Sequence, residues 1–146
     1  MANEKEILNK KLLGIISSME EQGLVNPRFR MIRTLKESNG PFFFAELIPT
    51  FCSDTRTTIR ELIRILEKPV VDFHILEELC MKIKGASSCI GAHQIALASG
   101  DLFRAVTDKC KERCVVAVDA IKHEFMRLNE RLDAVLQLEQ KILSHR

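Results

Sequence analysis

Apolar residues recur at helical spacing along almost the whole chain, and strand-like alternation never persists. Asn3 and Glu6 are spaced as a capping box, and Gly23 is placed to end the helix that they begin. Between these signals lies the first apolar stripe, which consists of Leu8, Leu12, Ile15, Ile16 and Met19. This spacing predicts helix and leaves no strand to build a sheet.

The same pattern predicts five further helices, over residues 27–39, 41–66, 72–89, 93–108 and 111–143. Asn26 and Asp72 are placed as N-caps, and Gly91 is placed to stop the fourth helix. Pro49 lies inside the third and should kink or break it. In the last helix either Leu138 or Glu139 marks a core position.

Amphipathic helices joined by short turns bury their stripes best as an antiparallel bundle. We therefore predict an all-α fold, an antiparallel four-helix bundle with two additional N-terminal helices. A length of 146 residues supports a single domain over residues 1–146.

Composition excludes several classes of function. The chain has 22 basic and 20 acidic residues and a net charge of +2, which is too weak a field to select nucleic acid. Its densest basic stretch, from Arg28 to Lys36, spreads around a helix. Charges interrupt every apolar run before the roughly 18 residues of a membrane span, and residues 1–11 do not resemble a secretory signal. We expect no membrane and no nucleic acid among the partners.

Five cysteines at irregular spacing argue against a disulfide framework and favour a reducing compartment. Cys110 and Cys114 share a helix face, but the further ligands of a zinc site are missing. We interpret these thiols as buried or half-buried residues, and expect neither metal nor cofactor.

Common catalytic signatures are also absent. The segment from Gly85 to Gly91 lacks the Lys-Ser/Thr ending of a phosphate loop, and His123-Glu124 is not followed by the second histidine of a metal pair. Acid–base or phosphoryl chemistry is therefore left with four histidines, at positions 74, 93, 123 and 145.

The fourth helix has two distinct faces. Leu76, Leu79, Cys80, Ile83, Ser87 and Ile90 fall within about 60° of one direction on a helical wheel and form the predicted core face. The outer face carries His74, Met81, Lys84, Gly85 and Ser88. A mid-helix glycine costs about 1 kcal/mol relative to alanine. Gly85 therefore serves either the close approach of another molecule or tight packing by a neighbouring helix.

The segment Met81-Lys-Ile-Lys-Gly-Ala-Ser-Ser-Cys-Ile-Gly-Ala92 resembles the signature of plant histidine-containing phosphotransfer proteins, His-Gln-x-Lys-Gly-Ser-Ser-x-Ser-Ile/Val-Gly-Ala. Further segments resemble the family in the same order along nearly the whole chain. They are Glu21-Gln-Gly-Leu-Val25, Phe51-Cys-Ser-Asp54, Val71-Asp-Phe73 and Leu136-Gln-Leu-Glu-Gln-Lys-Ile142.

The chain departs from this signature at its reactive position. The phosphoacceptor histidine of the family aligns with Met81, and the glutamine after it aligns with Lys82. A thioether cannot form a phosphoramidate. In active members the lysine matching Lys84 helps to hold the phosphoryl group and the glycine matching Gly85 clears space for the partner; Ala86 replaces a serine common in the family. The chain resembles the pseudo-phosphotransfer proteins, which lack the histidine.

The resemblance implies a non-enzymatic protein, a monomer in the cytoplasm and nucleus, that binds receiver domains of hybrid sensor histidine kinases and response regulators. It would compete with active members and damp a phosphorelay such as cytokinin signalling. We predict docking through Met81, Lys82, Lys84, Gly85 and Ser88, with His74, Phe29 and Ile32 beside them. Two alternatives stay open, namely phosphotransfer through a displaced histidine such as His74, and a helical module with unrelated partners.

Overall fold

The computed structural model describes residues 3–145, which form seven helices. Helix α1 (Glu4–Glu21) begins where the Asn3 side chain accepts a hydrogen bond from the Glu6 backbone N–H at 2.8 Å. Helix α2 (Pro27–Thr34) begins at Asn26, whose side chain accepts from Arg28 N–H at 3.0 Å. Both predicted N-caps are confirmed.

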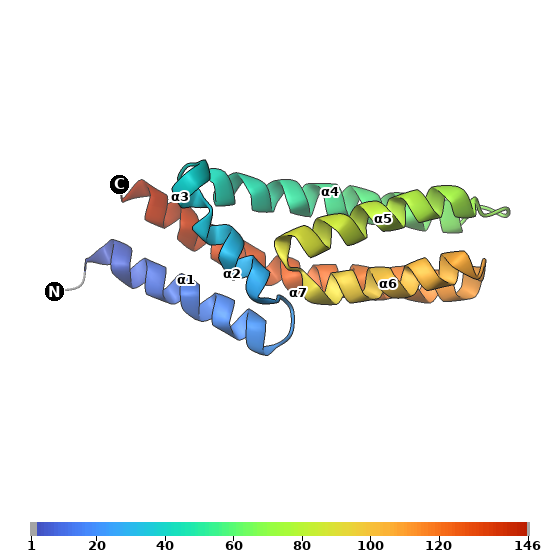
Figure 1. Ribbon diagram of the computed structural model, residues 1–146, viewed down its shortest axis with the longest axis horizontal. Coiled ribbons are helices and arrows are strands. Elements are labelled where there is room, and N and C mark those ends of the chain that lie inside the picture. Colours follow the sequence, from blue (N-terminus) through green and yellow to red (C-terminus); the bar gives the residue numbers. More distant parts are fainter. Residues whose placement is uncertain (1–2, 146) are drawn as a thin grey trace.

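The segment after α2 differs from the prediction. A separate four-residue helix, α3 (Lys36–Asn39), follows Leu35, and Gly40 ends it at a positive φ of 99°. Helix α4 (Phe43–Leu66) is continuous through Pro49, so the predicted break does not occur (Figure 1). Pro49 is exposed and lies in the second turn of α4, where it removes one backbone donor without interrupting the buried stripe.

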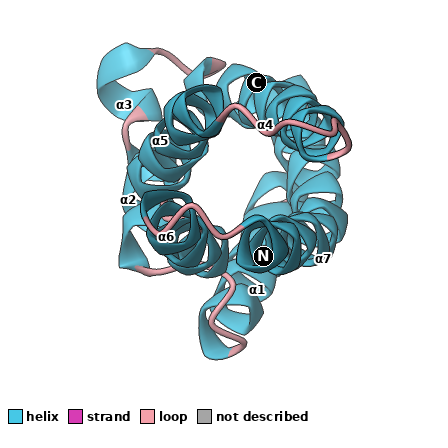
Figure 2. Cartoon of the chain, turned by 90° about the vertical axis from the view of Figure 1, so that its right-hand side faces the viewer, coloured by secondary structure: helices cyan, strands magenta, loops and turns pink. Residues whose placement is uncertain are grey.

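The last three helices lie close to the predicted bounds: α5 (Phe73–Ile90), α6 (His93–Thr107) and α7 (Lys111–Ser144). Helices α4 to α7 form a ring in that order, with α5 and α6 on one side and α4 and α7 on the other (Figure 2). Successive members run in opposite directions, so the predicted antiparallel four-helix bundle is confirmed.

The N-terminal helices extend the bundle at one end. Helix α1 packs along the C-terminal part of α7, and α2 crosses to the end of α5 (Figure 1). A buried carboxylate fixes this arrangement: Glu139 on α7 is 0% exposed and lies 3.0 Å from Arg33 and 2.6 Å from Lys36. Glu139, rather than the half-buried Leu138, therefore occupies the core position left open above.

The four basic residues between positions 28 and 36 all make contacts within the chain. Arg28 donates to the Cys89 carbonyl at 2.7 Å, and Arg30 pairs with Glu20 at 2.9 Å. Arg33 and Lys36 both pair with Glu139, as described above. Within residues 3–145, no helix is both long enough and apolar enough to cross a membrane.

Candidate functional site

Both ends of α5 are set by capping residues. Asp72 Oδ1 accepts hydrogen bonds from the backbone N–H of His74 and Ile75, at 3.1 and 3.2 Å. Gly91 ends the helix in the left-handed conformation, with φ of 81°. The predicted core face is confirmed by the buried residues Leu76, Cys80, Ile83, Ser87 and Ile90, whereas Leu79 is half-buried.

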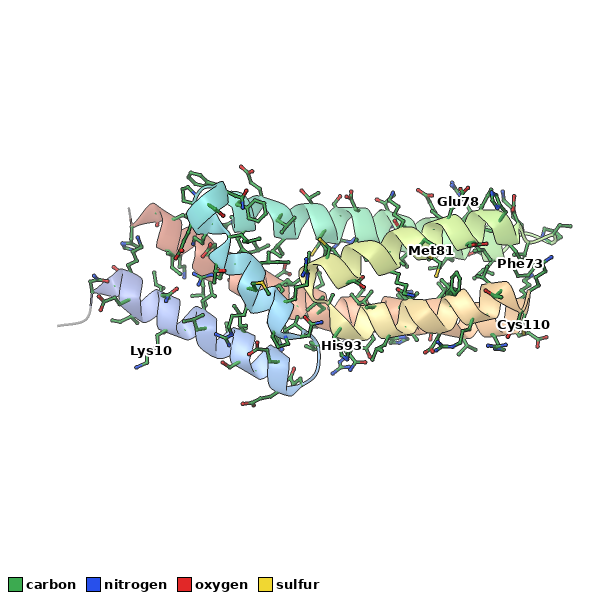
Figure 3. All side chains as sticks on the ribbon, viewed as in Figure 1. Lys10, Phe73, Glu78, Met81, His93 and Cys110 are labelled. Atoms are coloured by element: carbon green, nitrogen blue, oxygen red, sulfur yellow. The ribbon has the colours of Figure 1, made fainter. Side chains whose placement is uncertain are left out.

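The opposite face of α5 presents the predicted docking residues. Met81 is 49% exposed and lies midway along α5, where α5 and α6 run side by side (Figure 3). Lys82, Gly85 and Ser88 are exposed, and Lys84 is half-buried. A flexible, polarisable methionine at this place can adapt to an apolar partner surface.

Gly85 is not required by packing within the chain. A Cβ added there would meet no heavy atom within 4 Å, outside its own helix backbone and immediate neighbours. The alternative that Gly85 makes room for a neighbouring helix is therefore wrong. The open surface above Gly85 remains available for a second molecule.

Lys84 reaches across to the neighbouring helix. Its ammonium lies 5.7 Å from the centroid of the Phe103 ring on α6, within the range of a cation–π interaction. Lys84 makes no ion pair with any carboxylate in the described part of the chain. A positive charge is thus held beside Met81 without a neutralising partner.

None of the four histidines occupies the place of Met81. His74 is on the outer face, and its Nε2 lies 3.2 Å from Glu78 Oε1, so a carboxylate already faces the ring. His123 lies on α7, with Nδ1 3.4 Å from Asp119. His145 lies 3.7 Å from Glu4, and His93 is exposed at the start of α6 (Figure 3).

Phe29 and Ile32, predicted to lie beside the docking residues, are in the core instead of on the surface. Phe29 is fully buried and packs edge-on against Phe44, with ring centroids 5.6 Å apart, and Ile32 is 5% exposed. Helix α2 turns this pair into the core and exposes Met31 and Leu35 instead, by 55% and 39%. Both pairs are apolar and have helical spacing, so the spacing alone did not show which pair faces the core.

Contacts that the sequence pattern did not indicate hold α2 beside the site. Gly91 O accepts from Asn26 N–H at 3.0 Å, and Arg28 donates to the Cys89 carbonyl at 2.7 Å. A Cβ on Gly91 would come within 2.6 Å of Asn26 Oδ1 and 2.7 Å of Phe29 N. Gly91 therefore ends α5 and admits the backbone of α2.

The reactivity of the cysteines follows from their burial. All five cysteines are free, and desolvation raises the pKa of both Cys52 and Cys80 to about 11. Cys110 caps α7 without a side-chain hydrogen bond, and Cys114 is buried. Among residues 3–145, no group of three or more His, Cys, Asp and Glu side chains is arranged to hold a metal ion.

A large hollow lies apart from Met81. It has a volume of about 990 Å³, is lined by residues from the α4–α5 and α6–α7 ends of the bundle, and includes His74. Its walls mix apolar side chains such as Phe73 and Val70 with charges of both signs. Around Met81, by contrast, Lys82, Gly85 and Ser88 are exposed on the outer face of α5.

Known proteins resemble the chain over almost its whole length, although no family model matches it. Histidine-containing phosphotransfer protein 2 of Oryza sativa is 31% identical, with 94% of this chain and 93% of that protein covered. Pseudo histidine-containing phosphotransfer protein 2 of the same organism is 22% identical, over 92% and 89%. An X-ray structure of a histidine-containing phosphotransfer protein from rice gives a TM-score of 0.90 at 30% identity, covering 97% and 99%.

Proposed function

The chain belongs to the plant family of histidine-containing phosphotransfer proteins, and from this premise we propose that it is a pseudo-phosphotransfer protein. It docks on receiver domains of hybrid sensor histidine kinases and response regulators without accepting phosphate. The observation that carries this proposal is Met81, which is exposed in the middle of α5 beside Lys84 and Gly85. Its thioether has no proton to exchange and cannot form a phosphoramidate.

Docking and chemistry depend on different features of this surface. Docking needs shape and accessible apolar area, which the open backbone at Gly85 and the exposed side chain of Met81 supply. Lys84 adds a positive charge that favours an acidic receiver pocket. Phosphate acceptance needs an imidazole nitrogen, and Met81 supplies none.

A protein of this kind acts by competition. By occupying receiver surfaces it would reduce phosphate transfer between receivers and active phosphotransfer proteins, and so damp a two-component phosphorelay. We propose cytokinin signalling as the setting, the cytoplasm and nucleus as the location, and a monomer as the working state.

The test is a transfer assay with wild type and Met81→His side by side. After incubation with a phosphorylated receiver domain, wild type should carry no acid-labile phosphate, while Met81→His should gain it because Lys84 and Gly85 already frame the position. Titration calorimetry should show that both proteins bind the receiver with about 8 kcal/mol, a micromolar dissociation constant.

Two results would contradict the proposal. Histidine-linked phosphate on wild type would restore the displaced-histidine alternative, and its loss in His74→Gln would locate the acceptor. An absence of receiver binding for wild type would favour a helical module with unrelated partners. A folded Met81→His protein that binds but accepts no phosphate would mean that the site differs from an active one by more than one side chain.

A further inference from the structure

A groove lies between α4 and α7. These two helices form the side of the ring away from α5 and α6 (Figure 2). Two adjoining hollows of about 290 and 260 Å³ share Ile63 and Lys122. The lining runs from Arg56 to Glu67 on α4 and from Val115 to Met126 on α7. At 1.5 Å per residue each wall is about 16 Å long.

The groove has an apolar floor with exposed apolar ends. Ile59 and Phe125 are each 5% exposed and form part of the floor of one hollow. Val115 lies at one end with 46% exposure, and Met126 at the other with 57%. Apolar side chains that stay exposed around a recess mark a surface on which another molecule can bury area.

Charge distinguishes the two ends. The hollow at the Phe125 end is lined by three basic residues, Arg56, Arg60 and Lys122, and by no acidic residue. None of these three forms an ion pair among residues 3–145. The Arg56 guanidinium is held 5.6 Å from the centroid of the Phe125 ring, at the groove.

The Val115 end is different in sign. Glu67 and Asp119 line the hollow there together with the shared Lys122. Asp119 already faces His123, whose Nδ1 lies 3.4 Å away. The unpaired charges of Arg56 and Arg60 therefore lie at the Phe125 end, and that of Lys122 lies where the two hollows meet.

We propose that this groove is a second docking site, and that it takes an amphipathic helix of a partner protein with Asp or Glu beside its apolar stripe. Three turns of helix match the length of the walls, with apolar residues at i, i+3 or i+4, and i+7 lying on the floor. Carboxylates near one end of that helix pair with Arg56, Arg60 and Lys122, whose rim position favours charge-assisted hydrogen bonds.

The shape of the groove favours a helix over two other occupants, a second copy of the chain and a lipid surface. A second copy of the chain, set groove to groove, would face one recess with another and leave both unfilled. A lipid surface binds protruding apolar side chains, whereas Ile59 and Phe125 are recessed. Because the groove lies across the bundle from Met81, the protein can hold this helix and a receiver domain together.

The test uses the full chain, labelled with ¹⁵N, and a synthetic helical peptide of about 15 residues with Leu at i, i+4 and i+7 and Glu on both flanks. The matched peptide carries Lys in place of Glu. We expect amide shift changes in residues 56–67 and 115–126 with the Glu peptide, and at least tenfold weaker binding of the Lys peptide. Changes centred on Met81 and Gly85, or equal binding of both peptides, would overturn the proposal.

Charge reversal on the rim gives the second arm. Arg60→Glu with Lys122→Glu should weaken binding of the Glu peptide by about tenfold or more, since both side chains are exposed and their loss leaves the core intact. Lys10→Glu with Lys11→Glu, two exposed lysines on α1, is the matched control with the same change of charge and should leave that affinity unchanged. Unchanged binding by the double variant would overturn the proposal. So would binding to phosphatidylserine vesicles, or self-association, in place of binding to the peptide.

Discussion

The ammonium of Lys84 lies 5.7 Å from the centroid of the Phe103 ring, so a charged residue of α5 is positioned by an aromatic residue of α6. A cation held over a ring at a partly exposed site gains about 0.5–1 kcal/mol. This contact limits the conformational freedom of a long side chain three residues after Met81. The lysine is thereby kept beside Met81.

We predict that this positioning matters once an acceptor is restored. In the Met81→His background, Lys84→Gln should reduce the initial rate of phosphate acceptance by more than tenfold, and Phe103→Leu by a few-fold, because only the first removes the charge. The measurement is the rate with a phosphorylated receiver domain. Lys10→Gln, on α1 at the far end of the molecule, is the control (Figure 3). Equal rates for Lys84→Gln and Lys10→Gln would contradict the role of Lys84.

Substitutions at Gly85 should have opposite effects on the free energy of unfolding and on receiver binding. Gly85→Ala should raise the free energy of unfolding by about 1 kcal/mol, because the helix gains a better former and the added Cβ meets no neighbour. Gly85→Gln should weaken receiver binding by about tenfold, since its side chain occupies the surface that the partner approaches. Gly14→Gln, on α1, is the control for binding. Full affinity of Gly85→Gln would show that the glycine does not serve docking.

Local signals were enough to place most of the secondary structure. Asn3, Asn26, Asp72 and Gly91 act on backbone groups within a few residues of themselves, so the sequence predicts the helix ends that they cap. The core face of α5 was predictable for the same reason, because periodicity along one helix needs no knowledge of its neighbours.

Contacts between distant segments were not predictable in this way. The side of α2 that faces the core depends on how Gly91 admits its backbone, and that close approach is invisible in the sequence of either segment. A glutamate at a helical core position is ambiguous until its partners are known, and Arg33 and Lys36 lie more than a hundred residues before Glu139. The same limit explains why Phe29 and Ile32 were misplaced.

Gly91 should be far less tolerant of substitution than Gly14. Gly91→Ala should lower the free energy of unfolding by at least about 2 kcal/mol, because φ is 81° and the new Cβ would press on Asn26 and Phe29. Gly14→Ala, in mid-helix with open space around it, should be neutral or stabilising by up to about 1 kcal/mol. Urea unfolding of both variants checks this, and similar values would contradict it.

The buried carboxylate of Glu139 should contribute strongly to stability. Glu139→Gln keeps the volume but leaves Arg33 and Lys36 without a counter-charge in a site where they are only 12% and 20% exposed. We expect a loss of roughly 3 kcal/mol in the free energy of unfolding. The matched exposed pair is Asp101 with Arg104, for which Asp101→Asn should cost less than about 1 kcal/mol. Equal losses for the two variants would mean that Glu139, Arg33 and Lys36 together add no more stability than a surface ion pair.

Alkaline pH should destabilise the fold through two buried thiols. Burial raises the pKa of Cys52 and of Cys80 from 9.0 to about 11. An unfolded chain releases these protons near pH 9, whereas the folded chain keeps them until about pH 11. The stability that the neutral thiols provide is therefore complete below pH 9 and is lost as the pH rises from 9 through 11.

Urea unfolding between pH 8 and pH 11 measures this loss. Cys52→Ala with Cys80→Ala should lower stability at pH 8, because both side chains leave cavities, but should flatten the decline above pH 9. Cys89→Ala, whose side chain is exposed, controls for the replacement of a cysteine as such and should leave the steepness of the decline unchanged. If the stability of the double variant declines as steeply as that of wild type, other groups cause the loss of stability above pH 9.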